Sequence, residues 1–175
     1  GDKELRGPIS AGLPTLEVHR GKDPLFTYLD LMNNLLVDEV LIGDISISEE
    51  ALVRIQEYIE NDVIVLRTKN VQIDDPRLED IFWDTHTNRR DVSDYVVRSA
   101  KTRLVVDFEV EPIPPKERKL GTITIDNKNY GRYNGEMQIT KRDLPEDERV
   151  NVLGQVIPED LRLLEFILGG VNFKF

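Results

Sequence analysis

Residues 24–68, PLFTYLDLMNNLLVDEVLIGDISISEEALVRIQEYIENDVIVLRT, alternate between two kinds of hydrophobic pattern. Apolar residues recur at helical spacing over 24–36 and again over 49–61. The apolar runs 39–44 and 63–68 are short and typical of buried strands. The order helix–strand–helix–strand predicts a parallel sheet covered by helices. Two such units cannot close a barrel or bury both faces of a sheet, so we expect this part of the chain to be a fragment.

The pattern changes near residue 72. Beyond it the chain consists mostly of short β-type runs separated by turns that contain Gly, Pro or Asn: YVVRSA, RLVVDFEV, TITIDN, EMQIT and VNVLGQV. A short helix is expected at 158–167 and a last strand at NFKF. Several short strands at regular spacing favour a closed antiparallel barrel or a sandwich. We therefore expect two domains, 1–72 and 73–175.

Composition narrows the classes of function. The formal net charge of −10 argues against binding to nucleic acid or to an acidic membrane, because both need a basic surface. A few local arginines can still bind a small anion. The chain has no cysteine, which excludes disulfides, thiolate zinc sites and a cysteine nucleophile, and it has no apolar run of roughly 20 residues. We expect a cytoplasmic protein.

Metal binding is not expected either. The two histidines, His19 and His86, are far apart and lack the spacing of a metal motif, and no acidic stretch follows a calcium-loop pattern. No other cofactor is indicated.

Five segments carry a resemblance to a known family: GLPTLEVHRG (12–21), VLIGD (40–44), HTNRRDVSDYVVRS (86–99), GTITIDNKNYGRYNGEMQI (121–139) and LPEDERVNVLGQV (144–156). In this order they resemble the C-terminal half of the bacterial 6-phospho-N-acetylmuramidases, a family earlier described as outer surface proteins. The resemblance implies an α+β chain: the C-terminal fragment of a (β/α)₈ barrel, followed by a cyclophilin-like closed antiparallel β-barrel.

The resemblance also implies a reaction. Members of the family cleave the disaccharide of N-acetylmuramic acid 6-phosphate and N-acetylglucosamine during peptidoglycan recycling in the cytoplasm. Glycoside hydrolysis usually needs two carboxylates across the scissile bond, and in a (β/α)₈ enzyme these lie at the ends of several strands. By the family layout this pair precedes the chain. We therefore leave the catalytic residues unassigned and expect this chain alone to be inactive as a glycosidase.

Candidate substrate contacts in the first domain follow the expected barrel strands. Glu17, His19 and Arg20 would follow the sixth strand, and Asp44 ends the seventh, where side chains face the active site of such barrels. The alternative is structural: Glu17 and Arg20 pair in solvent, and Asp44 makes a turn.

Two further clusters lie in the second domain. One contains His86, Thr87, Asn88 and Arg89, whose guanidinium group matches a phosphate or the lactyl carboxylate; the alternative is a polar turn. In the other, Tyr130 or Tyr133 could cover the apolar face of a sugar, and Arg132 could bind an anion. The alternative there is a hairpin shaped by Asn and Gly.

Three functions remain open. The first is the substrate-recognition part of a phosphosugar hydrolase, and the second is a non-catalytic module that binds phosphorylated amino sugars. A peptidyl-prolyl isomerase is disfavoured, because the Arg–Phe–Phe–Gln–Trp–His set of cyclophilins is absent and a shared fold does not carry function. Uncovered strand edges and apolar faces in residues 1–70 also predict self-association or local disorder of these residues.

Overall fold

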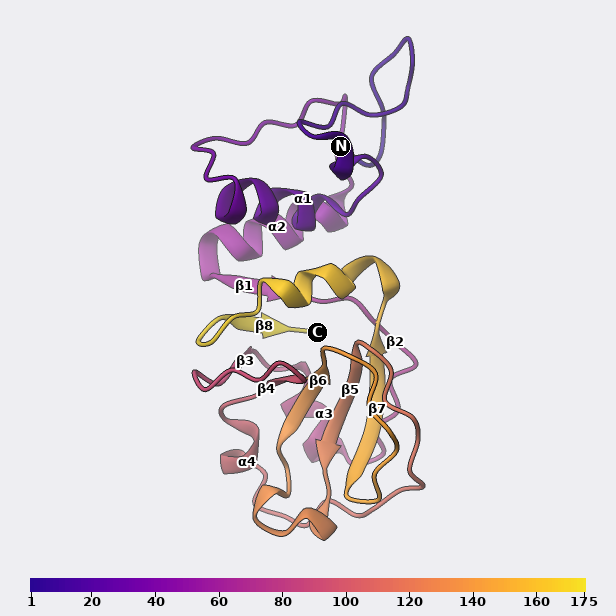
Figure 1. Cartoon of the computed structure of the whole chain (residues 1–175), viewed down its shortest axis with the longest axis vertical. Coiled ribbons are helices and arrows are strands. Elements are labelled where there is room, and N and C mark those ends of the chain that lie inside the picture. Colours follow the sequence, from indigo (N-terminus) through magenta and orange to yellow (C-terminus); the bar gives the residue numbers. More distant parts are fainter. The chain divides into compact units, whose positions relative to one another are not determined.

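The computed structural model describes all residues from Gly1 to Phe175. The chain forms two compact units, Gly1–Asp62 (unit 1) and Val63–Phe175 (unit 2), which are described separately (Figure 1). The change in sequence pattern lies later, near residue 72. Residues 63–65 belong to unit 2 because they pair with the C-terminal strand.

Unit 1 is helical and irregular. Its elements are the 3₁₀ turn η1 (Glu17–His19), the helix α1 (Pro24–Leu29), the π-turn η2 (Asp30–Asn34) that continues α1, and the helix α2 (Glu49–Asn61). Both α-helices begin at capping residues whose side chains accept a backbone N–H: Asp23 accepts from Phe26, and Ser48 accepts from Ala51. A buried ion pair joins the helices, with Arg54 Nη1 2.7 Å from Asp23 Oδ2.

The strand expected at residues 39–44 does not form. This segment has no regular secondary structure, and the side chain of Leu41 is 79% exposed. A strand needs a neighbouring strand to satisfy its backbone groups, and unit 1 contains none. The expectation that residues 1–72 fold as the last units of a (β/α)₈ barrel is therefore wrong.

Unit 2 contains two sheets. The three-stranded sheet has the order β1 (Val63–Val65), β8 (Asn172–Lys174), β3 (His86–Thr87), with β1 and β8 parallel. The five-stranded sheet is antiparallel, with the order β2 (Thr68–Lys69), β7 (Val150–Val156), β5 (Thr122–Asp126), β6 (Met137–Thr140), β4 (Val96–Arg98). Its strands lie side by side in the lower part of Figure 1.

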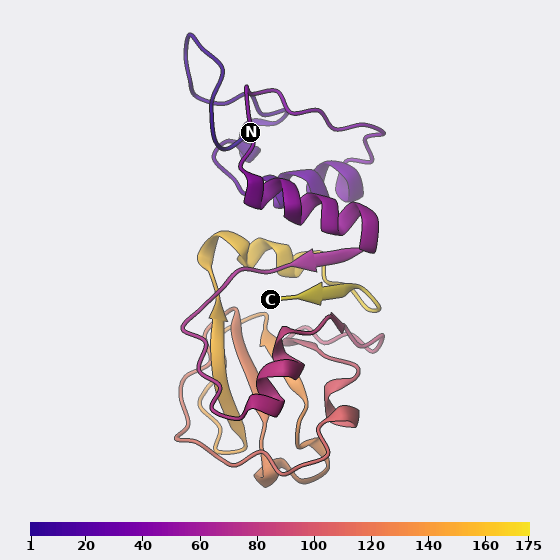
Figure 2. The ribbon, with the colours of Figure 1, turned by 180° about the vertical axis from the view of Figure 1, so that it is seen from behind.

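The helices of unit 2 are short. They are α3 (Pro76–Trp83), α4 (Thr102–Val105) and the 3₁₀ segments η3 (Lys128–Tyr133) and η4 (Pro158–Glu165). Helix α3 lies on one face of the five-stranded sheet, behind the strands in Figure 1 and in front of them in Figure 2. Leu78 and Phe82 are its buried residues. No helix of the protein is both long and apolar enough to span a bilayer.

The expected closed cyclophilin-like barrel is also not observed, because the five-stranded sheet ends at β2 on one side and β4 on the other. Residues 103–110, expected as a strand, begin in α4 and continue without regular structure. Side-chain amides bond to this segment in place of a neighbouring strand: Asn134 Oδ1 accepts from Val110 N, and Asn134 Nδ2 donates to Phe108 O. The segment is thus fixed without joining a sheet.

Strand β5 is buried on both faces. Ile123 and Ile125 point to one face and belong to the apolar core. Thr122, Thr124 and Asp126 point to the other face, because side chains alternate along a strand, and they are buried as well. The second face of the sheet therefore has a polar and covered centre.

Candidate functional site

A pocket of about 280 Å³ lies over the polar face of the five-stranded sheet. Its lining comes from β4, β5, β6, η3 and the connections between them: Ser93, Val96, Arg98, Asp126, Tyr130, Tyr133, Glu136 and Gln138. Only one of these eight side chains is a simple hydrocarbon. Polar groups that converge on a cavity fix the orientation of a small ligand and give specificity.

The strand register places the polar groups of this pocket. Gln138 on β6 pairs with Arg98 on β4 and with Thr124 on β5, so their side chains share one face. Asp126 follows Thr124 by two residues, and Glu136 precedes Gln138 by two, so both point to the same side. The floor of the pocket is therefore built on strands.

Two tyrosines on η3 form an aromatic wall. The ring centroids of Tyr130 and Tyr133 are 5.4 Å apart, and the rings meet edge to face. Asn127 caps η3 by accepting a hydrogen bond from Asn129 N. Both rings make cation–π contacts. Arg149 Cζ lies 4.5 Å from the centroid of the Tyr130 ring, and Arg103 Cζ lies 5.4 Å from that of the Tyr133 ring.

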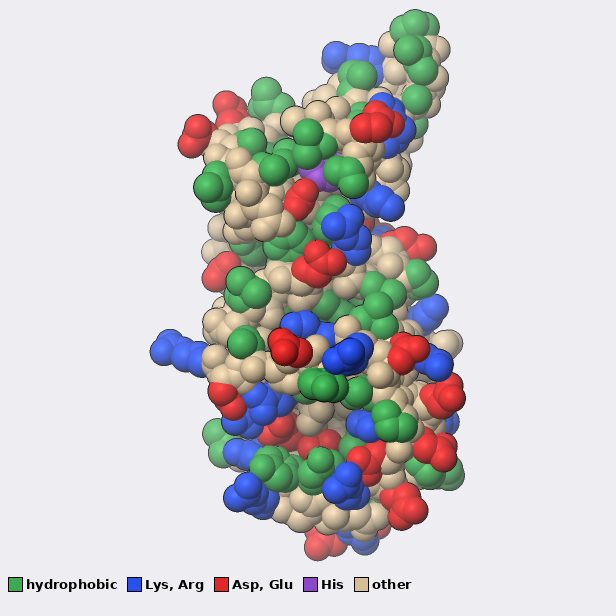
Figure 3. All heavy atoms as spheres, viewed as in Figure 1, with side chains coloured by type: hydrophobic (Ala, Val, Ile, Leu, Met, Phe, Trp, Pro, Cys, Tyr) green, Lys and Arg blue, Asp and Glu red, His purple; other side chains and the backbone are tan.

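Arginines gather beside the pocket around two carboxylates. Arg89 binds Asp91 with two parallel bonds of 2.9 and 2.8 Å, and Arg98 Nη2 lies 3.0 Å from Asp91 Oδ2. Glu136 Oε2 forms ion pairs with Arg89 Nη1 at 3.1 Å and with Arg103 Nη1 at 3.6 Å. The hydrogen bonds from Arg89 lower the pKa of Asp91 to about 2. Basic and acidic side chains are interspersed over unit 2 in Figure 3, despite the acidic total charge.

Asp126 differs from the other acids of the site. Its Oδ2 accepts a hydrogen bond of 3.2 Å from Gln138 Nε2, whereas its Oδ1 is buried and has no partner. Burial, and then the nearby charge of Glu136, raise the pKa of Asp126 to about 8. A pKa of about 8 favours the neutral, protonated form of Asp126 at pH 7.

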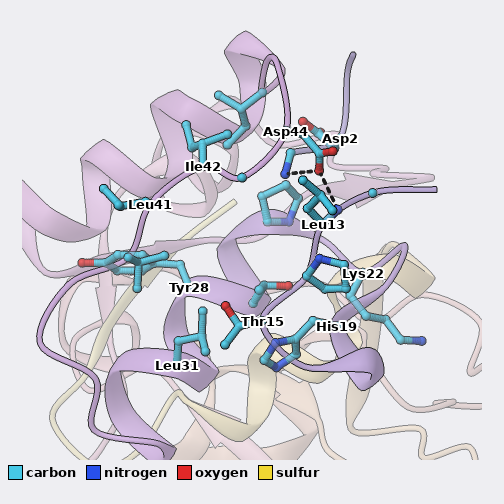
Figure 4. A pocket seen from close by; sticks show the side chains of 18 of the residues that line it. Asp2, Leu13, Thr15, His19, Lys22, Tyr28, Leu31, Leu41, Ile42 and Asp44 are labelled. Carbon is cyan, nitrogen blue, oxygen red and sulfur yellow. Dashed lines mark hydrogen bonds and ion pairs between the residues drawn. The ribbon is translucent and has the colours of Figure 1, made fainter. Parts of the chain in front are cut away.

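A second and larger pocket, of about 520 Å³, lies in unit 1 (Figure 4). Figure 4 shows His19, Thr15 and Lys22 on one side of it and Tyr28 and Leu41 on the other. Many of its lining residues are aliphatic, including Leu5, Leu13, Leu31, Leu41, Ile42, Ile47, Leu52, Ile55 and Ile59.

Three of the four unit 1 site residues expected from the sequence line this pocket: His19, Arg20 and Asp44. Asp44 accepts hydrogen bonds from Arg6 N, from the Gly1 amino group and from Leu13 N, and the first of these is the main cause of its lowered pKa. Its oxygens are thus already used.

The remaining polar groups of unit 1 also bond locally. Glu17 and Arg20 form an exposed bidentate pair, with distances of 2.5 and 2.7 Å, which lowers the pKa of Glu17 and raises that of Arg20. His19 is buried with Nε2 2.8 Å from Asp30 Oδ2, and its Nδ1 has no partner. Only His19 retains an unused polar atom that is buried.

The cluster from His86 to Arg89 divides between core and pocket. Both ring nitrogens of His86 lie 3.1 Å from partners, Ser99 Oγ and Phe82 O, and burial lowers its pKa. Thr87 Oγ1 donates to Asn172 Oδ1, and Asn88 donates to Ile167 O and accepts from Arg98 N. Within this cluster, only Arg89 forms a side-chain to side-chain bond with a residue that lines the pocket, Glu136.

In the hairpin, Tyr130 lines the pocket, whereas Arg132 lies outside it and donates a 2.9 Å hydrogen bond to the Tyr133 hydroxyl. Sequence reasoning missed Arg98, Asp126, Glu136 and Gln138. The alternation of Thr and Asp with Ile in TITID was a visible signal. It predicts a polar face but not that this face is covered.

Comparisons with known proteins place the chain in a family. Models of the 6-phospho-N-acetylmuramidase family match it twice, the N-terminal model over residues 1–57 and the C-terminal model over residues 64–175. A search of curated proteins finds no match.

Two solved structures resemble the chain over 99% of its length. One is a conserved Enterococcus faecalis protein of unknown function, with 40% identity and a TM-score of 0.86; the chain covers 47% of it. The other is an uncharacterized B. cereus protein, with 28% identity and a TM-score of 0.79; the chain covers 50% of it. The chain thus spans about half the length of both. Since the C-terminal model alone matches more than half of the sequence, this protein belongs to the 6-phospho-N-acetylmuramidase family.

Proposed function

We propose that the pocket of unit 2 recognises the phosphorylated amino sugar in a 6-phospho-N-acetylmuramidase reaction, the cleavage of N-acetylmuramic acid 6-phosphate from N-acetylglucosamine. The observation that carries the proposal is the combination of the Arg98 guanidinium group, two tyrosine rings and a polar floor in one pocket, with Arg89 beside it. Family membership supports the reaction class. Such a substrate, formed during sugar uptake, would be met in the cytoplasm.

The proposed phosphate contacts are Arg89 and Arg98. Both bind the carboxylate of Asp91, whose side chain is 62% exposed in the connection between β3 and β4. Two parallel N–H bonds to a carboxylate have the geometry with which arginine binds phosphate. In this proposal Asp91 occupies the anion position until a phosphate replaces it.

The proposed sugar contacts are Tyr130 and Tyr133, with Gln138 and Ser93 as hydrogen-bonding partners of hydroxyl groups. The pyranose ring has apolar C–H faces that suit an aromatic wall. The unit 1 residues His19, Arg20, Asp44 and Glu17 stay as secondary candidates, because all but His19 already use their polar atoms within the fold.

Calorimetry with N-acetylmuramic acid 6-phosphate tests the proposal, with unphosphorylated N-acetylmuramic acid and inorganic phosphate as comparison ligands. We expect Arg98→Ala to weaken binding of the phosphorylated sugar about tenfold or more, which corresponds to one lost charge-assisted contact. We expect Asp91→Asn to strengthen it several-fold, because a competing anion is removed.

Asp94→Asn is the matched control, since it removes the same charge from an exposed residue three positions away. It should leave the affinity unchanged. Equal binding of the phosphorylated and unphosphorylated sugars would contradict the proposal.

The alternative, a binding module without chemistry, uses the same pocket. Its test is turnover of the phosphorylated disaccharide. We expect this chain to bind it without hydrolysis, because Glu136 is held by two arginines and Asp126 alone cannot supply both carboxylate roles. Hydrolysis by the isolated chain would contradict this part of the proposal.

A further inference from the structure

We propose that Asp126 is a ligand-binding residue, and that its buried Oδ1 at the floor of the unit 2 pocket makes a hydrogen bond to an uncharged oxygen of the bound sugar. The inference deepens the proposed function and rests on it for the identity of the ligand. It concerns a different part of the ligand from the phosphate.

The first argument is geometric. Buried polar atoms almost always have a partner, and only two buried side-chain atoms in the protein lack one, Asp126 Oδ1 and His19 Nδ1. Asp126 is 2% exposed and lines the pocket. Asp160, also buried in unit 2, has partners for both of its oxygens, because both accept hydrogen bonds from Arg67. Asp126 therefore lines the pocket and keeps one oxygen without a partner.

The second argument concerns the charges around Asp126. Glu136, which precedes β6, and Asp147, which precedes β7, both raise its pKa, after burial as the largest cause. Arg118 and Arg149 partly offset them. Arg98 on β4 and the tyrosines of η3 complete the pocket, and the side chain of Arg98 bonds to Asp91. No cation forms an ion pair with Asp126.

These surroundings define the ligand group. A protonated carboxyl group donates one hydrogen bond. The O–H at Oδ1 can therefore donate to a hydroxyl oxygen or to the carbonyl oxygen of an N-acetyl group. A phosphate at this position would be repelled by Glu136, whereas the arginines beside Asp91 suit it. The pocket thus has an anion end and a neutral end.

The experiment measures the affinity for N-acetylmuramic acid 6-phosphate between pH 7 and 9.5, with the full chain and the variants Asp126→Ala, Asp126→Asn and Asp94→Asn. The second ionisation of the phosphate, near pH 6, is complete over most of this range. We expect unaltered protein and Asp94→Asn to lose affinity above pH 8, as Asp126 ionises. Asp126→Asn should lack this loss, and Asp126→Ala should bind about tenfold more weakly at pH 7. Trp83 fluorescence checks folding.

The outcomes separate this inference from the proposed function. If Arg98→Ala weakens binding and Asp126→Ala does not, the inference is wrong and the proposed function stands. If Asp126→Asn loses affinity above pH 8 to the same extent as the unaltered chain, Asp126 is not the titrating contact, and the inference is again overturned. No phosphate-dependent binding by the unaltered chain would overturn both.

Discussion

Asp126 and Asp160 are buried in the same unit with different surroundings. Asp160 faces Arg67, which supplies three donors to its oxygens. Asp126 has one amide donor and a second acid nearby. Burial and the charge of Glu136 raise the pKa of Asp126. Two aspartates buried in one unit therefore differ in their hydrogen-bond partners.

The protonation of Asp126 makes stability depend on pH. Its folded pKa of about 8 lies above the unfolded value near 4, so the folded chain binds the proton more tightly. The resulting stabilisation is complete below about pH 4 and is lost as the pH rises to about 8. We expect unaltered protein to lose a few kcal/mol between pH 5 and pH 8, at about 1.4 kcal/mol per pKa unit, and Asp126→Asn to lose much less.

Urea unfolding followed by Trp83 fluorescence measures this difference, because the single tryptophan lies in α3 of unit 2. Asp94→Asn serves as the control for removing one acid. If the free energy of unfolding of Asp126→Asn and of unaltered protein changed with pH in parallel, Asp126 would be ionised in the folded chain.

At the scale of residues, the sequence could identify only part of the site. Arg89 and Tyr130 were expected because Arg and Tyr suit anionic sugars, and they lie beside and in the candidate pocket. His86 and Asn88 also have side chains that can bind a sugar, yet in the structure their polar atoms bond to other residues of the core. Asp126 and Arg98 could not be recognised, because their role depends on strands β4, β5 and β6 lying side by side, and that pairing is long-range.

At the scale of elements, local signals were sufficient where the neighbours are also local. The helical periodicity correctly predicted α1 and α2, and the TITID and EMQIT runs predicted β5 and β6, which pair as a hairpin. Two apolar runs, 39–44 and 103–110, have strand-like composition and form no strand. Whether an apolar run finds a partner is decided by the rest of the chain.

The β5–β6 hairpin depends on Gly135. Its φ is +85°, and a Cβ there would lie 2.6 Å from Val106 Cβ. We expect Gly135→Ala to destabilise unit 2 by about 2–4 kcal/mol, since it combines backbone strain with overpacking. Thermal unfolding followed by Trp83 fluorescence measures the loss.

Gly170→Ala is the matched control for this variant. Gly170 has a φ of +90°, and no atom lies within 4 Å of the place that an alanine methyl group would take there. It should cost only the backbone term, about 1–2 kcal/mol. Equal losses in the two variants would show that contact with Val106 plays no part.

At the scale of the whole molecule, the two units differ in how well they bury apolar surface. Unit 2 contains most of the buried apolar residues, whereas unit 1 exposes aliphatic side chains along the segment that follows η2: Leu36, Leu41, Ile42 and Ile45. Exposed apolar surface favours association. Unit 1 therefore exposes an apolar segment that can associate with another molecule.

We expect the chain to self-associate through this segment. Sedimentation velocity at rising concentration should show oligomers, and Leu41→Glu should shift the distribution towards monomer. Leu168→Glu introduces the same charge at an exposed apolar residue of unit 2 and should have no such effect. A monomer at every concentration, or equal effects of both variants, would contradict the prediction.

The amide side chain of Asn134, which replaces a strand neighbour for residues 108–110, also bears on how the protein ages. Asn134 precedes Gly135, a dipeptide in which little hinders the asparagine side chain from reacting with the next backbone nitrogen. In the folded chain that nitrogen donates to Asp126 O at 2.8 Å, which protects it. Deamidation would replace the donor to Phe108 O by a negatively charged acceptor. The lifetime of the pocket in storage is thus linked to how rarely this hairpin opens.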